Sequence, residues 1–407
     1  MKYPEQFLFE MPKTDLHLHL DGSLRLDSLI EMGKKLKLDL PSETPDGLKK
    51  LVFKDKYNDL GEYLNGFQYT CGAMRDLENI ERVSYELAVD NQKENVNYIE
   101  VRFAPQLLID LFKGLTFETI LTAVNKGLNR AKSEYNMSDT VCKDGRPKFD
   151  YGIISCAMRA FGPKGFSPYY TKLFNVMNYS QPTQVIQFAA MEMVRACVKL
   201  RDEKAIPIVA IDLAGQEEGH PAGRFKEAYA FAHKNFMNKT VHAGEAYGAE
   251  SIFEAITECY ADRIGHGYSL FMPDRILDKS ITNKDQYINN LASYIADRRT
   301  VIEVCLTSNL QTNPLIKNIK THKFQDMLDH RMATTICTDN RLVSNTTVTK
   351  EYKLATDNFN LPLKRLKDIV AYGFKKNFQY GTYVVKRQNA KENMIFFDKI
   401  AKKHGLV

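Results

Sequence analysis

The sequence predicts a (β/α)8 barrel of the TIM type, with extra loops and helices. Two observations support this fold class. Short apolar, β-branched segments alternate with longer segments of helical period, about eight times along 407 residues. The short segments are apolar on both faces, as expected for parallel strands that helices cover. An open doubly wound sheet is the alternative that this rhythm leaves open.

Each short segment has the length of a buried strand. The expected strands cover residues 14–20, 98–104, 151–158, 208–213, 240–243, 263–267, 301–306 and 333–338. A helix is expected from Leu77, because Ile80, Val83, Leu87 and Ala88 share one face. Helices are expected for the same reason in segments 186–200, 224–236 and 250–261.

Two stretches interrupt the alternation. Residues 136–150 form a turn-rich insertion before the third expected strand, and residues 161–182, rich in Gly and Pro, follow that strand. The second stretch is expected at the top face of the barrel. It is either a surface loop or a lid over a site, because top-face loops shape the pockets of barrel enzymes.

Composition excludes several classes of protein. Hydrophobic residues make up 44% of the chain and charged residues 26%, which is typical of a globular protein. The net charge of +6 is small for this length and does not indicate a nucleic-acid partner. No Gly/Ser linker divides the chain, so we expect one domain over residues 1–407.

The cysteines and the apolar segments indicate a cellular location. The seven cysteines show no CxxC spacing, a pattern that favours free thiols in a reducing compartment. No secretory signal is recognisable at the N-terminus, and no apolar stretch approaches the roughly 20 residues that cross a bilayer. A cytoplasmic protein without a membrane partner is therefore expected.

The pair His17 and His19 is the strongest chemical signal. Residues i and i+2 of a strand point to the same side, so the two imidazoles converge and can hold one ion. A structural pair is the alternative. His242, His266 and Asp339 fall at the ends of the fifth, sixth and eighth expected strands, the face where barrel enzymes keep their chemistry.

Imidazoles with a carboxylate suit Zn²⁺, with Fe²⁺ or Co²⁺ as possible substitutes. Such an ion lowers the pKa of a bound water to about 7. The residues alone therefore predict a metal-dependent hydrolase. Dinucleotide and ATP motifs are absent from the sequence, as is the H-x-E…P-C-x-x-C signature of the zinc deaminases that act on nucleic acids.

Several motifs together resemble the adenosine deaminase family, in the family's order and from position 11 to about 345. The first is MPKTDLHLHLDGS, and the others lie at 98–105, 212–217, 242–245, 263–267 and 337–339. The resemblance implies that one zinc ion is bound by four residues: His17, His19, His242 and Asp339.

The resemblance also implies roles in catalysis and substrate binding. Glu245 would protonate purine N1, His266 would orient the zinc water and help to deprotonate it, and Asp339 could accept a proton from that water. The backbone N–H of Gly215 would meet purine N3, Asp21 would bond a ribose hydroxyl, and His19 would lie against the substrate. The other histidines, at 220, 233, 322, 330 and 404, receive no role.

One position departs from the family pattern. The family commonly places a second Asp, followed by Pro, after the metal-binding Asp, whereas this chain has Asn340 and Arg341. An Asn amide donates to purine N7 without needing a proton of its own, so purine binding survives, but substrate preference and pH profile are affected. Arg341 is expected either at the surface or as a sensor of a carboxylate or phosphate.

The leading hypothesis is zinc-dependent conversion of adenosine, and of 2′-deoxyadenosine, to the inosine product and ammonia. Other substrates remain open: adenine, AMP or methylthioadenosine. AMP would require a cationic cluster, for which Arg159 and Lys164 are candidates. A catalytically silent nucleoside-binding protein and a barrel phosphoesterase or other amidohydrolase are the further alternatives.

Overall fold

The structure is a computed structural model that describes residues 2–313 and 316–407. Within them, eight parallel strands form one sheet in sequential order, and a parallel bridge between Leu18 and Asp339 joins its two ends. This confirms the (β/α)8 barrel. The strands are β1 (Lys13–His19), β2 (Val96–Phe103), β3 (Asp150–Met158), β4 (Ile208–Ala214), β5 (Asn238–Ala243), β6 (Arg263–His266), β7 (Val301–Val304) and β8 (Thr334–Ile336).

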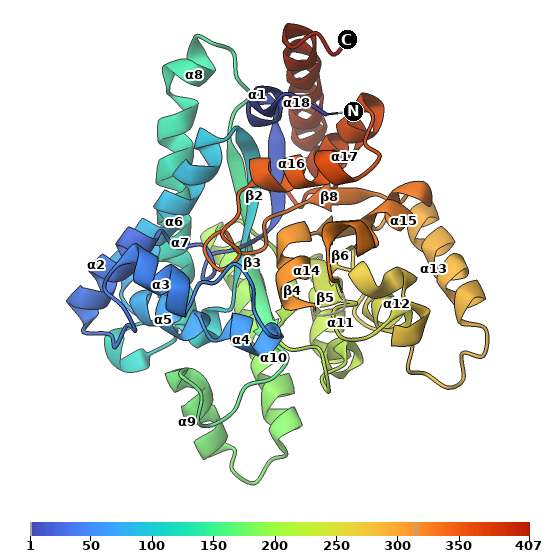
Figure 1. Cartoon of the computed structure of the whole chain (residues 1–407). Helices are drawn as coiled ribbons and strands as arrows, with labels where there is room; N and C mark the ends of the chain where they lie inside the picture. Colours follow the sequence, from blue (N-terminus) through green and yellow to red (C-terminus); the bar gives the residue numbers. More distant parts are fainter. Residues whose placement is uncertain (1, 314–315) are drawn as a thin grey trace.

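Helices surround the strands (Figure 1). The helices that precede β4 are α1 (Glu5–Glu10), α2 (Leu26–Leu36), α3 (Pro45–Leu51), α4 (Leu60–Leu64), α5 (Phe67–Ala73), α6 (Leu77–Lys93), α7 (Phe117–Asn136), α8 (Asp139–Cys142), α9 (Pro168–Val176) and α10 (Pro182–Lys204). Those that follow are α11 (Lys226–Lys234), α12 (Ala249–Thr257), α13 (Lys284–Arg298), α14 (Leu306–Thr312), α15 (Phe324–Asp329), α16 (Val348–Asn358), α17 (Leu363–Lys376) and α18 (Tyr383–Lys403). Short 3₁₀ turns cover 105–107, 111–113, 222–225, 268–271, 273–275 and 319–321.

The expected strands are confirmed with shifts of at most two residues at their ends. The last strand is shorter than expected because its chain turns away before Asp339. The backbone N–H and the hydroxyl of Thr338 both donate to the carboxylate of Asp15. The next residue, Asp339, adopts a left-handed backbone with φ of 61°. The four expected helical segments correspond to α6, α10, α11 and α12.

The expectation of a loop over residues 161–182 is wrong for Pro168–Val176, which form α9. The local sequence explains this helix, because Ser167 caps its first turn and Pro168 occupies the first helical position. The segment before α9 does reach the top face, where Phe161 and Phe166 line a cavity. Residues 136–150 are mostly irregular, apart from α8.

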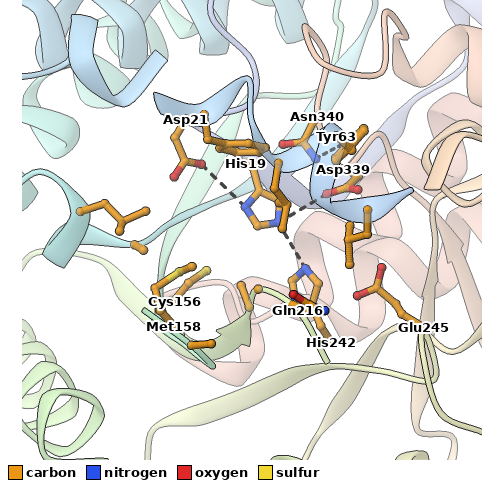
Figure 2. A pocket seen from close by; sticks show the side chains of 18 of the residues that line it. His19, Asp21, Tyr63, Cys156, Met158, Gln216, His242, Glu245, Asp339 and Asn340 are labelled. Atoms are coloured by element: carbon orange, nitrogen blue, oxygen red, sulfur yellow. Dashed lines mark hydrogen bonds and ion pairs between the residues drawn. The ribbon is translucent and has the colours of Figure 1, made fainter. Parts of the chain in front are cut away.

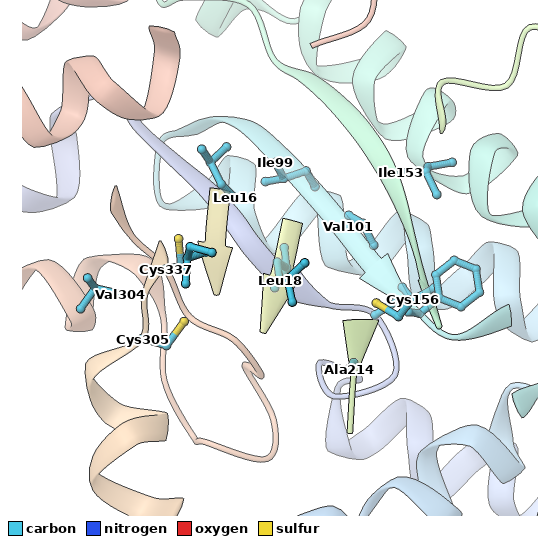
Figure 3. Packing of buried hydrophobic residues seen from close by; sticks show 14 of the residues in the cluster. Leu16, Leu18, Ile99, Val101, Ile153, Cys156, Ala214, Val304, Cys305 and Cys337 are labelled. Atoms are coloured by element: carbon cyan, nitrogen blue, oxygen red, sulfur yellow. The ribbon is translucent and has the colours of Figure 1, made fainter. Parts of the chain in front are cut away.

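Apolar side chains that alternate along the strands with the inward-facing polar residues form the main buried cluster. Figure 3 shows Leu16 and Leu18 of β1 with Ile99 and Val101 of β2 and Ile153 of β3, all of which are fully buried. Every residue of β1, β2 and β4 is buried, as parallel strands covered by helices require. In the described ranges no helix has both the length and the apolar character needed to cross a membrane.

A network of charged side chains lies inside the barrel. Arg102 donates to Asp212 and to Glu303, both at 2.9 Å, and Arg263 donates to Glu303 at 2.7 Å and to Glu100. These side chains are at most 1% exposed. Despite burial, which opposes the charge, Arg102 and Arg263 hold the pKa of Glu303 well below its ordinary value.

Removing one member of this network leaves buried charges without partners. Arg102→Met is expected to lower the free energy of unfolding by about 3–5 kcal/mol, because Asp212 and Glu303 lose their shared cation. Urea unfolding measures the change. Arg365→Met, which breaks a more exposed ion pair with Asp329, is the control and should cost less than about 1 kcal/mol. Equal losses in the two variants would contradict the prediction.

Candidate active site

A cavity of ≈ 260 Å³ opens at the carboxyl ends of the strands. Figure 2 shows polar side chains from several strands converging on it. Eight of the nine predicted site residues line it: His19, Asp21, Gly215, His242, Glu245, His266, Asp339 and Asn340. The ninth, His17, is fully buried and lies beside them. Apolar side chains form the remaining walls, among them Leu60, Leu64, Phe67, Leu107, Met158, Phe161 and Phe166.

Four of these side chains form a group that could hold a metal ion. One ligand atom from each of His17, His19, His242 and Asp339 lies within 4.8 Å of the others. The Nε2 atoms of His19 and His242 face each other at 3.3 Å, and those of His17 and His19 lie 3.4 Å from Asp339 Oδ1. His17 Nε2 is buried and has no hydrogen-bond partner in the described part of the chain. Such converging lone pairs fit a cation, as the donor set predicts.

Two buried carboxylates orient the imidazoles from behind. Glu303 lies 2.9 Å from His17 Nδ1, and Asp212 lies 3.0 Å from His242 Nδ1. A carboxylate accepts the proton of Nδ1, which leaves the Nε2 lone pair for an ion. Sequence reasoning missed both residues. Asp212 belongs to one of the motifs quoted above, whereas no motif contains Glu303.

The backbone of Asp339 is held between the two histidines of β1. Its N–H donates to the carbonyl of His17 at 2.8 Å, and its carbonyl accepts from the N–H of His19 at 2.7 Å. Asp339 and His266 both adopt left-handed backbone conformations, with φ of 61° and 62°. Residues with a side chain rarely adopt this conformation, and such strain is often found at functional sites.

The carboxylate of Asp339 stays ionised in this setting. Burial opposes its charge, but His17, whose Nε2 lies 3.4 Å away, and the neighbouring imidazoles lower the pKa of Asp339 below its ordinary value. An ionised carboxylate is the form that binds a cation.

Glu245 has the opposite electrostatic setting. Burial, helped by the negative charges of Glu217 and Asp339, raises the pKa of Glu245 to about 7. Its Oε1 lies 3.5 Å from His266 Nε2. Near neutral pH a substantial fraction of this carboxyl therefore carries a proton, as a proton donor requires.

Glu217 holds the loop that carries Glu245. Its carboxylate accepts hydrogen bonds from four successive backbone N–H groups, those of residues 244 to 247, at 2.7–3.2 Å. Sequence reasoning missed this role, although Glu217 ends the motif at 212–217. The loop is therefore fixed by a carboxylate of the chain itself.

Asp21 and Gly215 lie elsewhere on the cavity wall. Burial raises the pKa of Asp21 to about 7, and its Oδ1 has no hydrogen-bond partner among the described residues. Gly215 has φ of 94°, and a Cβ placed there would lie 3.3 Å from the end of Met158. The cavity wall thus contains a carboxyl oxygen that makes no hydrogen bond within the described ranges and lies 3.8 Å from His19 Nδ1, and a backbone position without a side chain.

Asn340 contacts α4 and the turn that follows β1. Its Nδ2 donates to the hydroxyl of Tyr63 at 2.7 Å, and that hydroxyl bonds Ser344 at 2.8 Å. Its Oδ1 lies against Gly22, where a Cβ would come within 1.7 Å of it. Tyr63 was not predicted, since nothing in its local sequence places α4 against the end of β8.

Two expectations about cations need correction. Arg341 is not a surface residue, because its side chain is 12% exposed and pairs with Glu94, a carboxylate of the chain itself. Arg159 cannot contribute to a phosphate cluster, because its terminal nitrogens donate to the carbonyls of His220 and His242. Among the described residues that line the cavity, none is Lys or Arg, so Lys164 does not line it either.

Solved structures share this fold. A cog1816 amidohydrolase from Burkholderia ambifaria, solved with bound Zn, has a TM-score of 0.76 at 17% identity, and the match covers 100% of this chain and 96% of that one. The N6-mAMP deaminase of Arabidopsis has a TM-score of 0.71 at 23% identity, with 97% and 99% covered. At these identities the likeness shows the barrel alone.

Sequence relatives are much more similar. An adenosine deaminase of Clostridium botulinum strain 657 is 34% identical over 364 residues, which are 88% of this chain and 92% of that protein. An adenosine deaminase of Vibrio atlanticus is 32% identical over 368 residues, 90% of this chain and 94% of that protein. The family model described as adenosine deaminase matches residues 12–381. The chain therefore belongs to the adenosine deaminase family.

Proposed function

We propose that this enzyme hydrolyses adenosine and 2′-deoxyadenosine to the corresponding inosine nucleosides and ammonia, with one zinc ion per chain. The observation that carries the proposal is the place of Glu245, a carboxyl with a pKa of about 7 in the same cavity as the four-residue group. A phosphoesterase has no need for a proton donor to purine N1. The bound Zn of the Burkholderia neighbour and the three-nitrogen, one-oxygen donor set support zinc.

A zinc ion held by His17, His19, His242 and Asp339 would supply a water of lowered pKa. Glu245 gives its proton to purine N1, which makes C6 electrophilic. Asp339, ionised and itself a member of the group, accepts the proton that the attacking water loses. The proton that Asp339 accepted passes to the amino group, and the C6 hydroxyl returns a proton to Glu245. The C6–N6 bond breaks, ammonia leaves, and C6 keeps the oxygen as a carbonyl.

The remaining predicted residues bind the nucleoside. The backbone N–H of Gly215 meets purine N3, because the missing side chain permits close approach. The unpaired carboxyl oxygen of Asp21 suits a ribose hydroxyl. His19 lies beside Asp21, with 3.8 Å between its Nδ1 and Asp21 Oδ1, and so contacts the same part of the substrate. Asn340 Nδ2 uses one proton for Tyr63 and keeps the other for purine N7.

The lining of the cavity favours a nucleoside over a nucleotide or a free base. A 5′-phosphate would meet no Lys or Arg among the described lining residues, and free adenine would leave Asp21 without a partner. A single domain over residues 1–407 and a cytoplasmic location remain predictions.

The substrate prediction is tested by the ultraviolet change on deamination. Adenosine should be converted with kcat/KM at least about 100-fold above that of AMP, since an unpaired phosphate beside Asp21 costs more than about 2.7 kcal/mol. Adenine and methylthioadenosine are assayed in parallel, before and after chelation. Faster turnover of AMP would reject the nucleoside assignment, and turnover that survives complete chelation would reject the metal.

Proton donation is tested with Glu245→Gln, which keeps the shape of the side chain but has no acidic proton. We expect kcat to fall about 10²–10⁴-fold, while zinc content and inosine affinity persist. Glu258→Gln, at a half-exposed carboxylate paired with Lys226, is the control and should leave kcat unchanged. A wild-type rate in Glu245→Gln would remove Glu245 from the mechanism.

The metal group is tested by zinc content after dialysis. Asp339→Ala and His17→Ala should each reduce the zinc from one equivalent to about a tenth or less, because the group loses one of four ligands. His233→Ala changes an imidazole that stacks on Tyr260 and serves as the control. Full zinc occupancy in both site variants would place the ion elsewhere.

A further inference from the structure

A chain of hydrogen bonds runs from a backbone amide to His266. The N–H of Phe324 donates to His322 Nδ1 at 3.0 Å, His322 Nε2 lies 3.1 Å from Asn309 Oδ1, and Asn309 Nδ2 lies 3.0 Å from His266 Nδ1. Asn309, His266 and His322 are between 0% and 2% exposed. His322, which received no role from its polar sequence surroundings, is thus buried directly behind the cavity.

The direction of this chain follows from its first member. A backbone N–H can only donate, so His322 Nδ1 accepts and carries no proton. Burial lowers the pKa of His322 to about 3, so the ring is neutral and its one proton sits on Nε2. That proton is donated to Asn309 Oδ1, which orients the amide with Nδ2 toward His266.

The same reasoning determines the state of His266. Its Nδ1 accepts from Asn309 Nδ2 and therefore carries no proton, so the ring cannot be a doubly protonated cation and is neutral. The proton of a neutral ring whose Nδ1 accepts must be on Nε2. Reversing the amide of Asn309 would set its NH₂ against the Nε2 proton of His322, two donors facing each other.

His266 Nε2 faces the cavity, 3.5 Å from Glu245 Oε1. A nitrogen that carries a proton donates a hydrogen bond and cannot accept one. With a lone pair on Nε2 instead, the ring would compete with the substrate for the proton of Glu245. The orientation set by Asn309 therefore leaves that proton available.

We propose that Asn309 and His322 are positioning residues that hold neutral His266 with its proton on Nε2, so that His266 donates a hydrogen bond toward the reacting atoms. This revises the expectation that His266 helps to deprotonate the water and leaves proton acceptance to Asp339. The role of His266 in turnover rests on the proposed function, whereas the position of its proton does not.

Three substitutions distinguish an effect of hydrogen-bond direction from an effect of side-chain packing. His322→Gln keeps an N–H donor near the position of Nε2, and His322→Leu removes it. Asn309→Asp keeps the size of the side chain but offers only acceptors, so that His266 must place a proton on Nδ1. His330→Leu, at an exposed histidine at the end of α15, is the control.

The first readout is the side-chain ¹⁵N spectrum of the zinc-loaded protein labelled at its histidines, with the His266 signals assigned from His266→Gln. We expect the Nε2–H form in the wild type and in His322→Gln, and protonation of Nδ1 in Asn309→Asp. The second readout is steady-state kinetics with adenosine. His322→Leu and Asn309→Asp should lower kcat about 10–100-fold with KM within about threefold, and His322→Gln should restore most of kcat.

An Nδ1–H form in the wild type would overturn the proposal. So would an Asn309→Asp protein with unchanged ¹⁵N signals, or equal loss of kcat in His322→Gln and His322→Leu, which indicates packing alone. If His322→Leu does not fold, the isosteric Asn309→Asp variant still tests the position of the His266 proton. A wild type that shows the Nε2–H form but does not turn over adenosine would refute the proposed function and leave the position of the proton supported.

Discussion

Charge buried inside the barrel must be neutralised by partners, and much of this structure depends on that requirement. Arg102 and Arg263 lie where a barrel interior normally holds apolar side chains, and they are tolerated because carboxylates surround them. The same carboxylates, Asp212 and Glu303, hold the imidazoles of His242 and His17. The interactions that stabilise the interior therefore also orient the proposed metal ligands.

The opposite ends of the sheet meet at the site. The bridge between Leu18 and Asp339 joins the ends of the sheet, and the backbone of Asp339 is bonded to both His17 and His19. Three of the four members of the proposed metal group are thus placed by main-chain hydrogen bonds, which are less adaptable than side-chain rotamers. The left-handed backbone at Asp339 is maintained by this closure.

The sequence predicts features that depend on neighbouring residues, but not contacts between residues that lie far apart along the chain. The strands and the residues at their ends, such as His242 and His266, follow from local apolar runs and short motifs. Glu303, Asn309 and Tyr63 act on partners up to 286 positions away, and no local pattern indicates such pairings. His322 was dismissed because its neighbours are polar, yet it is buried against Asn309. The short helix α9 was missed because Gly162, Pro163 and Gly165 shortly before it favour a loop.

The four amides that converge on Glu217 have a consequence for binding energy. A row of successive backbone N–H groups attracts anions from solution in many proteins, but here a side chain of the chain itself occupies that position. Little conformational entropy needs to be lost when a substrate arrives, since the loop of Glu245 is already ordered. More of the affinity for the purine is then available to the transition state, where an acid already in position is most effective.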